Sequence, residues 1–270
     1  MSTPSIPESV IETFARLTVT TGDLDPMYDL IWRGRREYGD QWAYRFVMHF
    51  FMFYDAGGAA AAAKHEGSFW QYCEDTYSTA RRGTERRHFR GNKGWKAILA
   101  FGAMGSPSQV WDLNANSYDI LSASIKHYWA GTQTGPYFAW KAMDLLDRCL
   151  GHEISLSLNE AAQFMPDEPR KCALALWPNR SIKESLVLVR DIISDLPAAG
   201  APGKLCGFAE AETVLCMIKG YFLTKTHTIG DDVDEKHAQL KDYPDLQKLL
   251  PPKQDWSQYV RTMDAASVPA

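Results

Sequence analysis

The chain has 270 residues, 45% of them hydrophobic, which is enough to bury the core of one large domain or two modest ones. No apolar run approaches the ~18 residues of a membrane-spanning helix, and the first residues lack the basic and apolar regions of a signal peptide, so we expect no membrane partner. The five cysteines are widely spaced without a Cys-x-x-Cys pair, which argues against a structural zinc site or a disulfide framework and fits a reducing, cytoplasmic setting.

Apolar residues recur at helical spacing through almost the whole chain, and no convincing alternating strand run occurs. Asp25 followed by Pro26 predicts the start of a helix through Tyr38, because proline is well tolerated at the first helical position. Further helices are expected over 41–54, from Gly57 toward Tyr77, after Ser106–Pro107, over 117–130, from the capping box Ser181–Glu184 to near Leu196, over 208–222 and over 231–243. The expected apolar stripe within 117–130 is Ile120, Leu121, Ile125, Tyr128 and Trp129.

These helices predict an all-α fold, a compact multi-helix body of about a dozen helices. We expect a single fused helical domain over residues 1–250, with a hairpin element at about 117–149, followed by a C-terminal arm over 251–270. The loop 197–204, rich in Pro, Gly and Ala, is the best candidate for a boundary if the chain divides.

Residues 81–96, which we call the basic segment, hold the strongest local signal. Seven cations accompany Glu85 as the single anion, so the segment carries a net charge of +6 within a chain of net charge −4. The cations are Arg81, Arg82, Arg86, Arg87, Arg90, Lys93 and Lys96. Such a concentration of charge predicts a polyanion site, and the interspersed glycines would let backbone amides approach an anion. The alternative is a solvated basic helix face, which the glycines and the interleaved Phe89 and Trp95 disfavour.

Two helices are expected to meet through a tight turn between Gly131 and Gly135, with Pro136 opening the second helix. Helix-hairpin-helix modules have this layout, and their backbone amides hold a DNA phosphate. A plain αα-corner, capped by Gly135, explains the same residues about as well. Both interpretations stand at this point.

Three side chains outside the basic segment are candidate general bases. His227 is next to several carboxylates and could serve as a general base near neutral pH, and Asp231 is one of those carboxylates. Asp55 stands where an apolar helix leaves the core. Each has a structural alternative: a helix-capping role for Asp231, a C-terminal turn for Asp55, and an ordinary structural histidine for His227. The spacing is not that of an EF-hand, and no metal site is expected.

The hairpin resembles that of the helix-hairpin-helix DNA glycosylases, with two departures. Tyr137 stands where the glycosylase/lyase branch carries its catalytic lysine, and Leu156 stands where those enzymes carry an aspartate. The resemblance therefore implies DNA docking and argues against cleavage of a glycosidic bond.

Over about residues 40–245 the chain resembles the bacteriophage amino acid:DNA transferases, also called α-glutamyl/putrescinyl thymine pyrophosphorylases. The resemblance rests most of all on Arg82–Gly91, read as Arg-Gly-x-Glu-Arg-Arg-x-Phe-Arg-Gly. The accompanying pieces are Phe53–Ala59 with Phe69–Trp70, the hairpin Gly131–Asp144, Glu212–Cys216 and Gly230–Asp232.

The resemblance implies a reaction on DNA in the cytoplasm of an infected bacterial host. The expected partners are double-stranded DNA carrying pyrophosphorylated 5-hydroxymethyluracil, and a free amino acid or other amine. The amine is joined to the 5-methylene carbon of the base, and pyrophosphate leaves. No cofactor is expected, although a Mg²⁺ ion bridging the pyrophosphate stays open. The alternatives are a glycosylase-like base-excision enzyme and a non-catalytic helical DNA-binding protein.

The reaction suggests a role for each candidate residue. Arginines suit the pyrophosphate because they offer forked, permanently charged donors, and a target base inside a duplex must be flipped out to react. The expected pyrophosphate-binding residues are Arg82, Arg86, Arg87 and Arg90. The candidate bases that take the proton of the amine are Glu85, Asp55, His227 and Asp231. The expected DNA-binding residues are Lys93, Lys96, Gly131, Gly135, Tyr137 and Lys141, with Lys141 also a candidate clamp for a substrate carboxylate.

Overall fold

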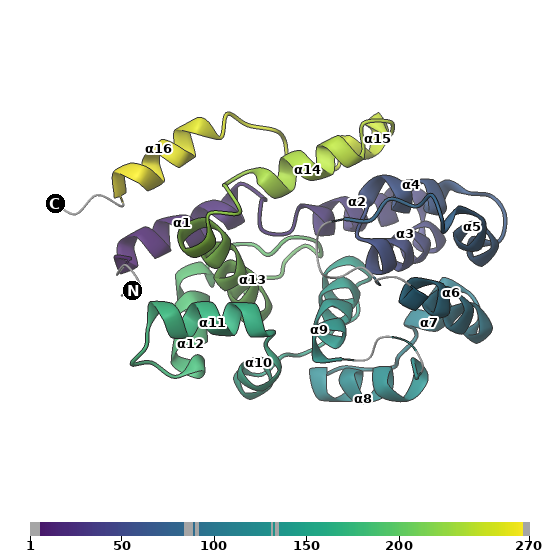
Figure 1. Ribbon diagram of the computed structural model, residues 1–270, viewed down its shortest axis with the longest axis horizontal. Helices are drawn as coiled ribbons and strands as arrows, with labels where there is room; N and C mark the ends of the chain where they lie inside the picture. Colours follow the sequence, from purple (N-terminus) through teal and green to yellow (C-terminus); the bar gives the residue numbers. More distant parts are fainter. Residues whose placement is uncertain (1–5, 84–88, 90–91, 131, 133–134, 267–270) are drawn as a thin grey trace. The chain divides into compact units, whose positions relative to one another are not determined.

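The computed structural model describes residues 6–83, 89, 92–130, 132 and 135–266. Over these residues the chain forms sixteen α-helices and two π-helical segments, without a β-strand (Figure 1). The all-α prediction is therefore confirmed, with more and shorter helices than expected. Two isolated β-bridges, Ser117 with Ser155 and Pro197 with Leu205, join loops.

The chain divides into two compact units, which we describe separately. Unit 1 comprises 1–26, 156–235 and 251–270, and unit 2 comprises 27–155 and 236–250. Unit 1 holds α1 (Glu8–Thr20), α10 (Leu158–Phe164), α11 (Asp167–Leu176), α12 (Ile182–Ile193), α13 (Phe208–Ile218), the π-helical segment η2 (Lys219–Thr224) and α16 (Ser257–Ala266). Unit 2 holds α2 (Pro26–Tyr38), α3 (Asp40–Phe53), α4 (Ala56–Lys64), α5 (Phe69–Thr76), α6 (Asn92–Met104), α7 (Pro107–Trp111), α8 (Tyr118–Tyr128), α9 (Pro136–Asp144), the π-helical segment η1 (Leu145–Cys149) and α15 (Pro244–Gln247). The helix α14 (Asp231–Gln239) begins in unit 1 and ends in unit 2.

The helix α3 forms the centre of unit 2, and α4 packs along it (Figure 1). Its sequence is apolar on nearly every side, and the eight residues from Phe46 to Phe53, together with Trp42 and Ala43, are all buried. The ring of Phe51 contacts the rings of Phe89, Trp111, Trp129 and Phe138 at centroid distances of 5.3–6.1 Å. This aromatic cluster ties α3 to α7, to the end of α8 and to the basic segment.

Local capping signals locate several helix starts correctly. The helix α2 begins at Pro26 and ends at Tyr38 as expected, and Ser106 and Ser181 form the complete capping boxes of α7 and α12. The helix expected from Gly57 toward Tyr77 is instead two helices, because the backbone is extended at His65 and Ser68 caps α5.

Two other expectations about helices are wrong. Ile120 and Tyr128 are 47% and 57% exposed, because the buried face of α8 follows the spacing of Tyr118, Leu121 and Ile125, which leaves Ile120 out of register. The helix expected over 208–222 ends as an α-helix at Ile218 and continues as η2.

Unit 1 is built around α1, α12 and α13. Phe14 of α1 is fully buried, with its ring 5.0 Å from that of Tyr221 and 5.3 Å from that of Phe222. The segment 251–270, expected to be an arm, contains α16, whose Met263 is fully buried. Among the described helices, none is both long and apolar enough to cross a membrane.

Candidate functional site

Two residues of the basic segment, Gly83 and Phe89, are hydrogen-bonded to the end of α3. The amide of Gly83 donates to the carbonyl oxygen of Phe53, and the amide of Phe89 donates to that of Met52, both at 2.9 Å. A Cβ on Gly83 would lie 2.2 Å from the carbonyl oxygen of Tyr54, so only glycine allows this approach. Four expected site residues, Glu85, Arg86, Arg87 and Arg90, lie outside the described residues. Gly83 and Phe89, the described residues on either side of 84–88, nevertheless bind adjacent residues of α3.

Arg82, just before this anchor, is exposed and rests on aromatic rings. Its guanidinium carbon lies 4.8 Å from the ring centroid of Tyr77 and 5.6 Å from that of Phe53. The guanidinium also donates to the carbonyl oxygens of Ala80 and Tyr77, each at 3.2 Å. These contacts orient Arg82 without neutralising its charge, which suits a residue that binds an anion.

Asp55 connects α3 to α4 and is almost buried. Tyr54, just before it, has left-handed backbone angles (φ 53°, ψ 36°), a conformation that non-glycine residues seldom adopt. The Oδ1 atom of Asp55 accepts a hydrogen bond of 2.6 Å from the amide of Gly58, so Asp55 is the N-cap of α4. Asp55 thus has a structural role, but it caps the start of α4 and is not a turn residue at the end of α3.

The Gly57–Gly58 pair allows two close approaches to α4. A Cβ on Gly57 would lie 2.5 Å from the carbonyl oxygen of Gln239, and one on Gly58 would lie 2.7 Å from Cε1 of His49. The amide of Ala56 donates to Oε1 of Gln239 at 2.9 Å. The two glycines therefore allow Gln239 of α14 and the side chain of His49 to pack closely against α4.

Two buried titratable residues at this place give no signal in the sequence. His49 is 2% exposed, burial lowers its pKa to about 3, and its Nδ1 has no hydrogen-bond partner among the described residues. Lys236 is 1% exposed, and its ammonium lies 4.3 Å from the ring centroid of Tyr54. Lys236 occurs in a polar stretch that predicts a solvated helix, so only packing shows that it is buried. We call Tyr54, Asp55, Gly58, His49 and Lys236 the α3–α4 junction.

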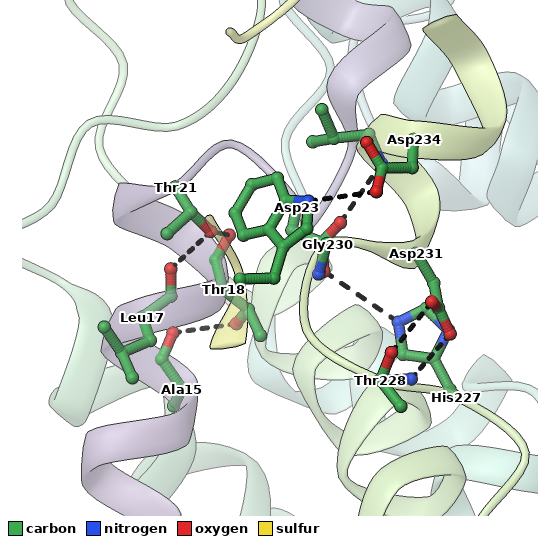
Figure 2. Close-up of polar contacts among 12 residues, drawn as sticks. Ala15, Leu17, Thr18, Thr21, Asp23, His227, Thr228, Gly230, Asp231 and Asp234 are labelled. Carbon is green, nitrogen blue, oxygen red and sulfur yellow. Dashed lines mark hydrogen bonds and ion pairs between the residues drawn. The ribbon is translucent and has the colours of Figure 1, made fainter. Parts of the chain in front are cut away.

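His227 and Asp231 belong to a separate cluster in unit 1 (Figure 2). His227 stands between two carboxylates, with Nε2 3.9 Å from Oδ2 of Asp23 and Nδ1 3.8 Å from Oδ2 of Asp231. Asp23 is fully buried, which raises its pKa, and it accepts hydrogen bonds from the amides of Gly230 (2.7 Å) and Val233 (3.1 Å). Asp23 therefore satisfies the first turn of α14 from the opposite end of the chain.

Asp231 has a structural role that differs slightly from the expected one. It is the first residue of α14 rather than the residue before it, and its carboxylate accepts from the amide of Thr228 at 2.7 Å and from the hydroxyl of Thr228 at 2.8 Å. Asp234 accepts a hydrogen bond of 3.1 Å from Nε1 of Trp256. The carboxylates around His227 are thus largely used to hold the start of α14.

The hairpin has the expected helices, and its cation Lys141 is buried. The helix α9 begins at Pro136 with Gly135 as its N-cap, and Gly131 lies outside the described residues. Lys141 is only 5% exposed, and its ammonium forms an ion pair of 3.2 Å with Asp144. Lys141 thus has a structural role inside unit 2, and its expected contact with DNA or a substrate carboxylate stays a prediction. Tyr137 is half-buried, and its ring lies 5.7 Å from that of Phe138.

The structure thus groups the expected site residues in two places. Arg82 and Asp55 flank the end of α3 in unit 2, and Lys93 and Lys96 are exposed on α6 in the same unit. His227 and Asp231 are in unit 1. In the part of the chain that the structure describes, no group of three or more His, Cys, Asp or Glu side chains could hold a metal ion.

Comparison with known proteins gives consistent matches. A family model described as amino acid:DNA transferase matches residues 19–222, a range that contains Asp55, the basic segment and the hairpin but ends before His227. The chain is similar to a putrescinyltransferase of Delftia phage PhiW-14, with 26% identity over 246 residues, covering 85% of this chain and 78% of that protein. It is also similar to a glycinyltransferase of Pseudomonas phage PaMx11, with 28% identity over 175 residues, covering 60% of this chain and 59% of that protein.

Proposed function

The chain belongs to the amino acid:DNA transferase family, and from this premise we propose that it joins an amine to the 5-methylene carbon of pyrophosphorylated 5-hydroxymethyluracil in DNA. The nitrogen lone pair of the neutral amine forms the new C–N bond. The C–O bond to the pyrophosphate breaks, the leaving group takes the electron pair, and a base takes the proton that the amine loses. The two relatives, named for putrescine and for glycine, support a polyamine or an amino acid as the donor class.

One observation carries the assignment of the site: the basic segment is anchored by Gly83 and Phe89 to the adjacent carbonyls of Phe53 and Met52, beside the α3–α4 junction. This anchoring supports a pyrophosphate site built from Arg82, Arg86, Arg87 and Arg90. Their guanidinium groups would neutralise the charge that develops on the leaving oxygen. Arg82, oriented by rings and carbonyls, is the described member of this group.

Glu85 is the best candidate for the base. It is the one carboxylate within the basic segment, where the leaving group would bind. Asp55 is second, because its Oδ1 already accepts a hydrogen bond from the amide of Gly58. His227 and Asp231 rank lower, because their contacts have a structural explanation and they lie beyond the range that the family model matches.

DNA would contact two further places in unit 2. The exposed Lys93 and Lys96 suit phosphates of the strand near the reacting base. The hairpin residues Gly131, Gly135 and Tyr137 would bind the DNA backbone through main-chain amides. We propose that the reaction needs no cofactor. We also propose that it takes place in the infected host cell, which the phage origin of both relatives supports.

The test is a transfer assay on duplex DNA containing pyrophosphorylated 5-hydroxymethyluracil. Each of a panel of amines, including glycine, serine and putrescine, is incubated with the full-length protein, and digested nucleosides are analysed by mass spectrometry. We expect one new nucleoside, in which the amine has replaced the pyrophosphate on the 5-methylene carbon, and an equal amount of free pyrophosphate, with or without a chelator. An unchanged base across the whole panel would contradict the proposal, and abasic sites would favour base excision.

Arginine variants test the site within the same assay. We expect Arg86→Ala and Arg90→Ala each to lower turnover on bound DNA by about 100-fold, the typical loss for one electrostatic donor. Arg180→Ala, at an exposed ion pair with Glu8 in unit 1, is the matched control and should keep full turnover. If the arginine variants lose only DNA affinity, the segment is a backbone-binding patch and not a pyrophosphate site.

A further inference from the structure

The exposed side of α6 presents two apolar and two cationic side chains. Trp95 is 37% exposed and Leu99 is 48% exposed, and residues four apart lie on the same side of a helix. Lys93 and Lys96 are also exposed. We call Lys93, Trp95, Lys96 and Leu99 the α6 face.

The described residues of unit 2 leave this apolar pair exposed. A single exposed leucine is ordinary, but a tryptophan and a leucine side by side leave apolar surface that water disfavours. Adjacent apolar side chains rimmed by polar ones mark interaction sites on soluble proteins. The α6 face has this composition on one side: Lys96 is three residues from Leu99 and Lys93 is three residues from Lys96, so both lysines lie beside Leu99, away from Trp95.

The two lysines lie near the N-terminus of α6, where a positive charge is unfavourable for helix stability. The N-terminus of an α-helix carries partial positive charge, so stability favours acidic residues there and disfavours cations. Lys93 and Lys96 lie near this end of α6, whose first turn has no acidic residue. Neither lysine forms an ion pair with any residue that the structure describes. Their charge is thus free to meet an anionic partner.

Trp95 is held in place by a neighbouring ring. Its ring is 5.5 Å from that of Tyr77 in an edge-on arrangement, and the guanidinium of Arg82 lies over Tyr77 at 4.8 Å. A Cβ on Gly94 would lie 2.9 Å from the hydroxyl oxygen of Tyr77, so a glycine permits this contact. A continuous row therefore runs from Arg82 through Tyr77 to Trp95.

We infer that the α6 face binds the DNA strand next to the reacting base, with Trp95 stacking on a base and the two lysines contacting phosphates. An exposed aromatic ring accompanied by cations is the composition that binds unstacked nucleotides, because every base offers a face for stacking. The inference rests on the proposed function, which requires a flipped base and therefore leaves neighbouring bases without a stacking partner.

Binding to DNA with an unstacked base tests the role of Trp95. The full-length protein is titrated by fluorescence anisotropy into a labelled duplex that contains one abasic position, and into the fully paired duplex. We expect Trp95→Ala to bind the abasic duplex about 5- to 150-fold more weakly, and Trp95→Phe, which keeps a stacking face, to recover most of this loss. Leu174→Ala is the matched control, because Leu174 is 49% exposed on α11 in unit 1.

The lysines are tested through salt dependence. Removing two phosphate contacts should reduce the slope of log affinity against log salt by about 1.8 on duplex DNA. We therefore expect this change for the double variant Lys93→Gln and Lys96→Gln, and no change of slope for Trp95→Ala.

Three results would overturn the inference. Trp95→Ala could bind both duplexes as the wild type does, or lose no more affinity than Leu174→Ala. Alternatively, sedimentation could show self-association that Trp95→Ala abolishes without effect on DNA binding, which would make the α6 face a protein interface.

The transfer assay separates this inference from the proposed function. If the wild type forms the modified base and Trp95→Ala matches it in binding and turnover, the inference about the α6 face fails and the proposed function stands. If no amine yields a modified base but DNA binding depends on Trp95, the proposed function fails and the α6 face remains a DNA contact.

Discussion

The burial of His49 predicts a pH dependence of stability that a single substitution should remove. The side chain is 2% exposed, contacts the ring of Phe53 in a tilted arrangement at a centroid distance of 4.6 Å, and has an Nδ1 without a hydrogen-bond partner among the described residues. Burial lowers its pKa to about 3 in the folded protein. In the unfolded chain a histidine has a pKa of about 6.5.

The direction of the effect follows from which state binds the proton. Between about pH 6.5 and about pH 3, the unfolded chain takes up a proton at His49 that the folded protein does not. The free energy of unfolding is therefore fully retained above the unfolded pKa and falls as the pH drops. For one such group it should be about 2 kcal/mol lower at pH 5 than at pH 7.5. This is a sizeable share of a typical stability of about 5–15 kcal/mol.

Urea unfolding at the two pH values measures the effect. We expect His49→Leu to lose about 2 kcal/mol less than the wild type on acidification, whatever its stability at pH 7.5, because the comparison is made within each variant. His127→Gln, at an exposed position on α8, should keep the wild-type pH dependence. Equal losses for His49→Leu and the wild type would refute the reasoning that burial keeps this imidazole neutral.

Three further substitutions test contacts described above. Gly83→Ala would place a methyl group 2.2 Å from the carbonyl oxygen of Tyr54, so we expect urea unfolding to show a loss of about 1–3 kcal/mol and a slower transfer reaction. Gly207→Ala, where the nearest atom would be 3.8 Å away, is its control, and equal losses would contradict the argument. Asp23→Ala leaves two amides at the start of α14 unsatisfied, and calorimetry should show a loss of about 1–3 kcal/mol for each, unless water replaces the carboxylate. Lys141→Met breaks a buried ion pair and should cost about 3–5 kcal/mol in urea unfolding, whereas a loss of DNA affinity in the folded variant would support the expected contact of Lys141 with DNA.

Local interactions made parts of the fold predictable. Pro26 at the first position of α2, and Ser106 and Ser181 as N-caps, act within one turn of the chain, so sequence spacing is sufficient to recognise them. The break between α4 and α5 was missed because the alanines that follow Gly58 favour a continuous helix. The exposure of Ile120 was missed because an apolar residue one position out of register still looks like part of the stripe.

The site was predictable in its charge but not in its geometry. A net charge of +6 within residues 81–96 and the resemblance of Arg82–Gly91 identify the anion-binding segment without any coordinates. Nothing in the spacing of the residues shows that Phe89 returns to Met52, because that hydrogen bond joins residues far apart in sequence. Asp23, the partner of the first turn of α14, was missed for the same reason.

The all-α class, most helix starts, the basic segment and the family can all be recognised from the amino-acid sequence alone. These depend on helical periodicity, on caps and on residue type, all of which are local. Which of the cationic side chains are exposed follows only from the packing of the helices. Two lysines that look equivalent in sequence to Lys93 are buried, Lys141 against Asp144 and Lys236 against Tyr54. Whether a charge is exposed depends on which helices pack around it, and that packing is set by contacts between distant parts of the chain.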